Sequence, residues 1–160
     1  MDKEKAQQIT VNLLIGFEQF RRYSYLDRSS SEAVRTIGFG QIYINHRKVQ
    51  EGDSITYDDA LSYLKQDVSK RMDEILIWAE NNNLKLNENE AAALCSFAFN
   101  EGVSCLEKSS LGKDLIANNR ENIKADFEMY NKIKINNKLV SSDGLLSRRR
   151  KEFDVFSSNS

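Results

Sequence analysis

Three side chains near the start of the sequence have types and spacing that suit acid–base chemistry on a glycosidic bond. Glu18 ends an amphipathic helical stretch, Asp27 follows nine residues later in a turn, and Thr36 opens an apolar segment with two glycines. A helix end and a two-stranded ribbon can form one wall of a cleft and bring both carboxylates to it. Glycoside hydrolysis needs such a pair. One carboxyl protonates the leaving oxygen, and the other stabilises positive charge at the sugar carbon, attacks it or activates water.

A purely structural interpretation fits the same three residues. Glu18 would then be a solvent-facing helix residue, Asp27 a turn former and Thr36 a β-branched residue that begins a strand. The spacing alone leaves both interpretations open.

The other side chains with distinctive chemistry are few. His46 is the only histidine, and its polar neighbours at 45–48 suit a solvated turn. A serine or cysteine hydrolase needs a base beside its nucleophile, and there is no second imidazole. Cys95 and Cys105 do not form the paired clusters of a zinc site, and two reduced thiols fit them better than a disulfide. We therefore expect no metal and no cofactor.

The composition limits the class of protein. The 160 residues are 40% hydrophobic, and 23 basic against 24 acidic groups give a net charge of −1. A disordered chain would be less hydrophobic and more highly charged, and a nucleic-acid-binding protein would be basic. No run approaches the roughly 18 apolar residues of a membrane span. We expect one globular domain over 1–160, monomeric, with no nucleic-acid partner and no stable membrane association.

The first residues of the chain do not resemble a signal peptide. They are mixed in charge, and the apolar stretch that follows lacks a small-residue cleavage site. We therefore expect synthesis in the cytoplasm.

Hydrophobic periodicity divides the chain into a small sheet lobe and a larger helical lobe. We predict a helix over 3–18, an irregular antiparallel sheet within about 19–56 and a long bridging helix over about 57–80. The helical lobe is expected over about 84–156, with an apolar central helix around 91–99, shorter helices near 110–118, 121–132 and 144–156, and a hairpin around 134–140. This order predicts an α+β fold, and the absence of proline suits its helices.

Two capping signals support the predicted helix starts. Thr56 precedes Asp59 by three residues, and Asn87 precedes Glu90 by the same spacing. Each pair can satisfy free N–H groups in the first turn of a helix.

Ordered segments of the chain resemble the phage-type (T4-like) lysozymes, or endolysins, of glycoside hydrolase family 24. Glu18 is followed by Tyr-Leu-Asp at 25–27 and Thr-Ile-Gly-Phe-Gly at 36–40. Further similar segments, in the same order, are 51–56, 66–68, 93–102, Gly144-Leu145, Arg148-Arg149 and Glu152. The resemblance covers residues 18 to about 156.

The resemblance implies a lysozyme-like fold with a sheet lobe and a helical lobe joined by a long helix. It also implies hydrolysis of the β-1,4 bond between N-acetylmuramic acid and N-acetylglucosamine in the glycan strands of peptidoglycan. Bacterial cells would lyse once the protein reaches the wall. By motif match Glu18 is the general acid, Asp27 the second carboxylate and Thr36 the hydroxyl beside the attacking water. The expected substrate contacts are Ile42, Phe99 and Asn100.

The expected general acid needs particular surroundings. A glutamic acid stays protonated at neutral pH when partial burial disfavours its charge, and Phe17 and Phe20 flank Glu18 in the sequence. Either Arg148 or Arg149 is expected to approach Glu18 from the C-terminal helix. Alternatively, both arginines belong to a solvated basic face.

The chain departs from the family pattern at three places. Gln19 replaces a common glycine, and the loop over 28–35 is longer than in the shorter members. Gln41 stands where histidine is common, so a contact from there to Asp67 would be at best a neutral-to-charged hydrogen bond.

Two other functions remain open. A degenerate lysozyme fold would bind wall polymer without cleaving it, and a lytic transglycosylase would keep the acid but release an anhydro product. The presence of Glu18, Asp27 and Thr36 together favours hydrolysis over both.

Overall fold

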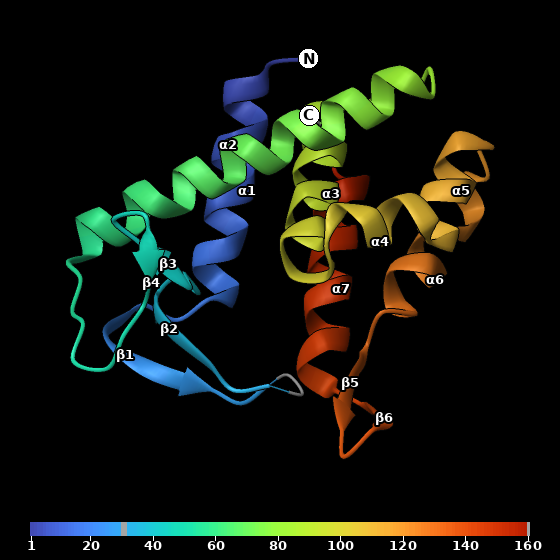
Figure 1. The fold of residues 1–160 in the computed structure, drawn as a ribbon. Coiled ribbons are helices and arrows are strands. Elements are labelled where there is room, and N and C mark those ends of the chain that lie inside the picture. The colour runs from blue at the N-terminus through green and yellow to red at the C-terminus, as the bar shows by residue number, and fades with distance from the viewer. Residues whose placement is uncertain (30–31, 160) are drawn as a thin grey trace.

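The computed structural model describes residues 1–29 and 32–159. Within them, in chain order, are α1 (Lys3–Phe17), β1 (Arg21–Asp27), β2 (Val34–Gly38), β3 (Tyr43–Ile44), β4 (Arg47–Lys48), α2 (Tyr57–Asn81), α3 (Glu88–Glu101), α4 (Val103–Lys108), α5 (Ser110–Ile116), a 3₁₀ helix (Arg120–Asn122), α6 (Ile123–Glu128), β5 (Lys132–Ile135), β6 (Lys138–Ser141) and α7 (Asp143–Ser157). Strands β1 to β4 form the sheet lobe, and the helical lobe contains α1 and α3 to α7 (Figure 1). This is the expected α+β architecture.

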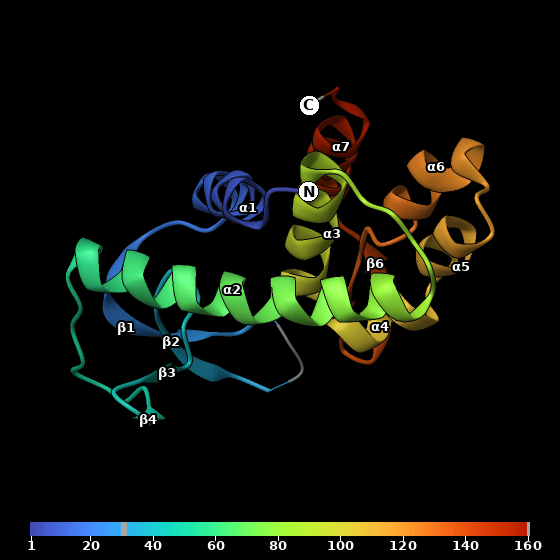
Figure 2. The same ribbon diagram turned by 90° about the horizontal axis from the view of Figure 1, so that it is seen from above.

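Helix α2 connects the two lobes (Figure 2). Near its start, the Ala60 methyl lies 3.1 Å from the position that a Cβ on Gly38 of β2 would occupy. Near its end, the Trp78 ring lies 3.4 Å from the corresponding position on Gly112 of α5. Two glycines therefore allow one helix to pack closely against both lobes, as the predicted bridging helix requires.

Both predicted capping signals are present in the structure. The Thr56 side chain accepts a hydrogen bond from the Asp59 backbone N–H, 3.1 Å away, at the start of α2. Asn87 and Glu90 form a reciprocal capping box at the start of α3. These local bonds satisfy backbone donors that a helix start leaves free, and so fix where each helix begins.

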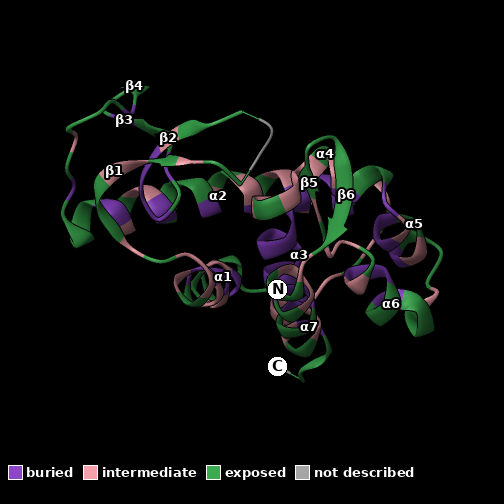
Figure 3. Ribbon diagram, turned by 90° about the horizontal axis from the view of Figure 1, so that it is seen from below, coloured by how far each residue is buried: buried purple, intermediate pink, exposed green. Residues whose placement is uncertain are grey.

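Helix α3 forms the centre of the helical lobe. Every residue from 90 to 98 is buried, which matches its nearly continuous apolar sequence. Helices α1, α2, α4 and α7 pack around it, and Figure 3 shows buried residues gathered on α3 and on the facing turns of α2. Each large apolar side chain buried here contributes about 1.5–3 kcal/mol.

The sheet lobe is more fragmented than the single sheet predicted from the sequence. β1 pairs with β2, and β3 pairs with β4, as separate antiparallel ribbons. Thr36 lies in the middle of β2 and does not open it. The strand ends early because Gly38 and Gly40 adopt φ values of 66° and 87°, which turn the chain. The expected long loop over 28–35 ends earlier than predicted, because residues 34 and 35 already belong to β2. Residues 30 and 31 of this loop lie outside the described residues.

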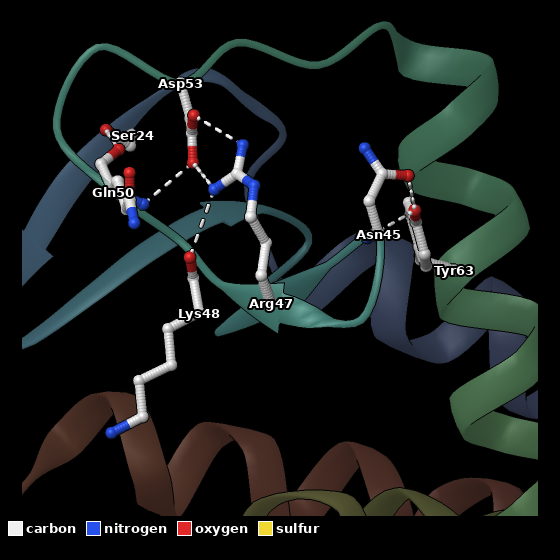
Figure 4. Close-up of polar contacts among 7 residues, drawn as sticks. All are labelled: Ser24, Asn45, Arg47, Lys48, Gln50, Asp53 and Tyr63. Atoms are coloured by element: carbon white, nitrogen blue, oxygen red, sulfur yellow. Dashed lines mark hydrogen bonds and ion pairs between the residues drawn. The ribbon is translucent and has the colours of Figure 1, made fainter.

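Polar contacts join the β3–β4 ribbon to the turn before α2 and to α2 itself (Figure 4). The Arg47 guanidinium donates to both carboxylate oxygens of Asp53, at 2.8 and 2.9 Å, and the Gln50 backbone N–H donates to the same carboxylate at 2.7 Å. These bonds lower the pKa of Asp53 to about 2. On the other side of β3, the Tyr63 hydroxyl of α2 donates to Asn45 at 2.9 Å.

Two elements of the helical lobe differ from the prediction. The expected helix over 121–132 ends at Glu128, because the residues from 132 alternate between lysine and isoleucine and form β5. Helix α4 was not predicted, and it begins after Gly102, whose φ of 99° separates it from α3. The predicted hairpin is confirmed as β5–β6, with Asn136 and Asn137 at positive φ in its turn.

Candidate active site

Glu18 is the C-terminal capping residue of α1. Its backbone N–H donates to the Leu14 carbonyl at 2.7 Å, and its side chain is 30% exposed. One carboxylate oxygen lies 3.7 Å from the position that a Cβ on Gly40 would occupy. The turn after β2 therefore passes beside the carboxylate at the end of the helix, and glycine suits position 40 because its φ of 87° is one that other residues rarely adopt.

Arg148 is the arginine that approaches Glu18. Its Nη1 atom lies 3.3 Å from the Glu18 Oε1 atom, and its side chain is only 8% exposed. The guanidinium also donates to the Ser96 carbonyl at 3.1 Å and lies 4.7 Å from the centre of the Phe17 ring. The alternative of a solvated basic face is therefore wrong for this residue.

Arg149 points elsewhere. It is fully buried, and its Nη2 atom donates to the Asn100 side-chain oxygen at 2.7 Å. Of the two phenylalanines expected near Glu18, Phe17 lies beneath Arg148, whereas Phe20 packs against the rings of Phe39 and Tyr57.

Asp27 and Thr36 share one face of the β1–β2 ribbon. Asp27 pairs with Val34 and Tyr25 pairs with Thr36, so the four side chains project from the same side. The Asp27 carboxylate is half-buried and accepts a bond from the Ser29 backbone N–H at 2.9 Å. The Thr36 hydroxyl is 3% exposed and donates to the Val34 carbonyl at 3.0 Å. Its oxygen keeps lone pairs that can accept a hydrogen bond from water.

Tyr25 lies within the electrostatic reach of both candidate carboxylates. Burial raises the pKa of Tyr25, and the charges of Asp27 and Glu18 raise it further. The Arg21 guanidinium lies 4.3 Å from the ring centre and opposes that shift. Tyr25 thus lies in the ribbon at a place where the charges of both carboxylates affect its pKa, although sequence reasoning assigned it no role. Its position in the 25–27 motif was the available signal.

The three expected substrate contacts lie on both lobes. Ile42, 45% exposed, lines a hollow of about 390 Å³ together with residues of β2, β3 and β4. Phe99 is half-buried beneath the Arg71 guanidinium, 5.4 Å from its ring centre. Asn100 is exposed at the end of α3 and bonded to Arg149. A second hollow, of about 380 Å³, lies between Arg28, Ser29 and the β5–β6 hairpin.

Gln41 does not make the contact with Asp67 that the sequence left open. Its side-chain oxygen accepts from the Phe39 backbone N–H at 2.7 Å, within the turn after β2. Its side-chain nitrogen is buried and has no hydrogen-bond partner among the described residues. The tight turn at Gly38 directs the amide oxygen inward, so the side chain stabilises its own turn instead.

The remaining candidates for chemistry lie apart from this site. His46 is exposed, with a φ of 61°, in the turn between β3 and β4. Both cysteines are free, and burial raises the pKa of Cys95 to about 12. Within residues 1–29 and 32–159 there is no metal-binding group of three His, Cys, Asp or Glu residues. In the same described part, no helix is long and apolar enough to cross a membrane.

Comparisons with known proteins agree with this geometry. The family model described as phage lysozyme matches residues 15–152. The endolysin of Acyrthosiphon pisum secondary endosymbiont phage 1 is 30% identical over 125 residues, covering 77% of this chain and 80% of that protein. The endolysin of Salmonella phage P22 is 30% identical over 129 residues, covering 80% and 83%.

A solved structure confirms the lysozyme-like fold. The endolysin from Escherichia coli O157:H7 phage FAHEc1 matches with a TM-score of 0.81 and 30% identity, over 94% of this chain and 91% of that one. The sequence resemblance, the fold and the matched family model agree over most of the chain. The chain therefore belongs to the phage lysozyme family of peptidoglycan-degrading glycoside hydrolases.

Proposed function

We propose that the protein is a muramidase that hydrolyses the β-1,4 bond between N-acetylmuramic acid and N-acetylglucosamine. The observation that carries this proposal is that β2 and the turn after it adjoin both carboxylates. The Glu18 carboxylate at the end of α1 lies beside Gly40 in that turn, and Asp27 at the end of β1 pairs with Val34 of β2. A glycosidic bond between two carboxyl groups has a proton donor on one side and a negative charge on the other.

Glu18 is the general acid in this mechanism. It transfers its proton to the leaving glycosidic oxygen as the bond to the sugar carbon breaks. Positive charge then develops at that carbon, and the Asp27 carboxylate stabilises it or takes a proton from the attacking water. The Thr36 hydroxyl already donates to Val34, so its oxygen accepts a hydrogen bond from the same water and orients it. Ile42, Phe99 and Asn100 contact the glycan strand.

The protein works in this proposal as a monomeric, single lysozyme-like domain over 1–160, without a metal or a cofactor. Its partner is the peptidoglycan glycan strand. The sheet lobe over about 19–56 supplies Asp27 and Thr36, and the helical lobe supplies Glu18, with the bridging helix over about 57–80 between them.

Digestion of purified peptidoglycan, with mass analysis of the products, tests the proposal against its alternatives. Hydrolysis yields reducing ends. A lytic transglycosylase yields anhydro ends, and a wall-binding protein yields no products.

The variant Glu18→Gln tests the assigned acid. It keeps the size and hydrogen bonding of the side chain but removes the transferable proton. General acid catalysis contributes about 10²–10⁴-fold, so digestion should fall by at least that range while thermal melting stays near wild type. The exposed Glu51→Gln is the matched control. Digestion by a folded Glu18→Gln at the wild-type rate would reject the assignment.

A further inference from the structure

Glu152 is a fully buried carboxylate that the proposed mechanism does not use. It lies on α7 with no exposed surface, between two arginines of the same helix. Its Oε1 atom is 2.8 Å from the Arg149 Nε atom, and its Oε2 atom is 3.9 Å from the Arg148 Nε atom. A buried carboxylate is costly unless it is paired, so its position between two guanidiniums requires an explanation.

Arg148 and Arg149 connect Glu152 to residues of the candidate site. Arg148 turns toward Glu18, at 3.3 Å, and Arg149 turns toward Asn100, at 2.7 Å. Each guanidinium also faces an aromatic ring, 4.7 Å from Phe17 for Arg148 and 4.9 Å from Phe97 for Arg149. The Glu152 carboxylate therefore contacts two arginines that in turn contact Glu18 and Asn100, two residues of the candidate site.

The charges around Glu152 are nearly balanced. Arg148 and Arg149 supply two positive charges, and the carboxylates facing them are Glu152, Glu101 and Glu18. Glu101 lies 3.6 Å from Arg149 and is partly exposed. Without the Glu152 charge, the two guanidiniums would face only Glu101 and Glu18, so more positive charge would be left beside Glu18. Added positive charge beside a carboxyl group favours its ionised form, whereas a general acid must donate a proton.

We propose that Glu152 is a positioning residue for the reaction, resting on the proposed function. It holds the Arg148 guanidinium at Glu18 and the Arg149 guanidinium at Asn100, and it offsets the positive charge that the two arginines bring to the candidate site. Burial raises the pKa of Glu152 to about 7 against the pull of both arginines, so this balance changes near neutral pH.

The test compares Glu152→Gln with wild type and with a matched control that also loses a carboxylate partner of an α7 arginine. Glu128→Gln serves as the control, because it removes the 3.3 Å ion pair between Glu128 of α6 and Arg150 of α7, which involves neither Arg148 nor Arg149. In the full-length protein with isotope-labelled arginine, Glu152→Gln should shift and broaden the Arg148 and Arg149 guanidinium resonances. Glu128→Gln should affect Arg150 alone.

Kinetics supply the second readout. In peptidoglycan digestion, kcat of Glu152→Gln should fall about tenfold or more with little change in KM, since misplacement of a catalytic group costs this much. The alkaline limb of its pH–rate profile should move to lower pH, which a merely structural role would not cause. Glu128→Gln should retain the wild-type profile.

The outcomes separate the two proposals. A folded Glu152→Gln with wild-type arginine resonances and an unmoved alkaline limb would overturn the positioning role, even if Glu18→Gln is inactive. An active Glu18→Gln would overturn the proposed function, while the arginine resonances would still report on the contacts of Glu152.

If Glu152→Gln does not fold, Glu152→Asp takes its place. It keeps the charge but withdraws the carboxylate, so the resonances should shift and kcat should fall while the alkaline limb stays in place. A folded Glu152→Asp with wild-type resonances and kcat would overturn the role.

Discussion

The Thr36 hydroxyl and the Asp27 carboxylate project from the same face of the β1–β2 ribbon, and the Leu26–Arg35 pair separates the two pairs to which they belong. The pairing of Asp27 with Val34 sets this relationship, because Thr36 is two residues beyond Val34 and alternate residues share a face. The hydroxyl donates its proton to the Val34 carbonyl, so the lone pairs of its oxygen are left to accept a hydrogen bond, as the proposed mechanism requires.

The variant Thr36→Val should lose activity while keeping its fold. It preserves the shape and the β-branching but removes the acceptor, so the proposed water loses one of its two partners. We expect the rate of peptidoglycan digestion to fall about tenfold or more, whereas Thr36→Ser should stay near wild type. Equal rates for Thr36→Val and wild type would show that the hydroxyl has no part in the reaction.

The turn after β2 should depend on the Gln41 side chain. In Gln41→Leu the buried Phe39 N–H loses its acceptor, and an unsatisfied buried donor costs about 1–3 kcal/mol. Urea unfolding should therefore show a lower free energy of unfolding for Gln41→Leu. Gln41→Glu keeps an acceptor oxygen and should lose less. The exposed Gln19→Leu provides the control, and a Gln41→Leu variant as stable as that control would contradict the assignment.

The Arg47–Asp53 contact should give a pH-dependent contribution to stability. The pKa of Asp53 is lowered to about 2 in the folded protein, from an ordinary value of 3.8. Its contribution is therefore complete above about pH 4 and is lost as the pH falls through about 2. Thermal melts of wild type and Asp53→Asn should differ at neutral pH and converge in acid. Glu51→Gln, exposed in the same turn, should follow wild type at every pH, and a difference for Asp53→Asn that is as large at pH 2 as at neutral pH would refute this origin.

The two thiols should differ in reactivity. Cys95 is buried against α2, and its pKa of about 12 keeps it protonated, whereas Cys105 is partly exposed. A thiol reagent at mildly alkaline pH should label one cysteine in the folded protein and both in denaturant. Cys105→Ser should abolish labelling of the folded form. Rapid labelling of that variant would indicate that the core around α3 opens readily.

Local signals predicted much of the fold. The caps at Thr56 and Asn87 involve residues three apart, so the helix starts followed from the sequence. The hairpin with its turn at 136–137 was also predictable from neighbouring residues, because asparagine tolerates the positive φ that this turn requires. The end of α6 and the start of α4 were missed, because short helices in this region depend on packing against α5 and α7 more than on their own sequence.

The candidate site was only partly predictable. Glu18, Asp27 and Thr36 followed from the order of the motifs, and their roles remain predictions. The choice between Arg148 and Arg149 could not be made from the sequence, since neighbouring residues on a helix point about 100° apart and only the packing of α7 on α3 fixes the rotation. The same packing buries Glu152, which sequence alone would place on a charged surface.

The two candidate carboxylates belong to different lobes, so their separation depends on how the lobes are placed. Glu18 ends a helix that packs against α3, whereas Asp27 belongs to a ribbon of the other lobe. Any rotation of one lobe relative to the other therefore changes the gap between the two carboxylates. Within the described residues, the chain crosses between the lobes at 18–20 and along α2, so Glu18 lies at one of these two crossings. In the proposed mechanism, bending of α2 would therefore change the space available to a glycan strand between the two carboxylates.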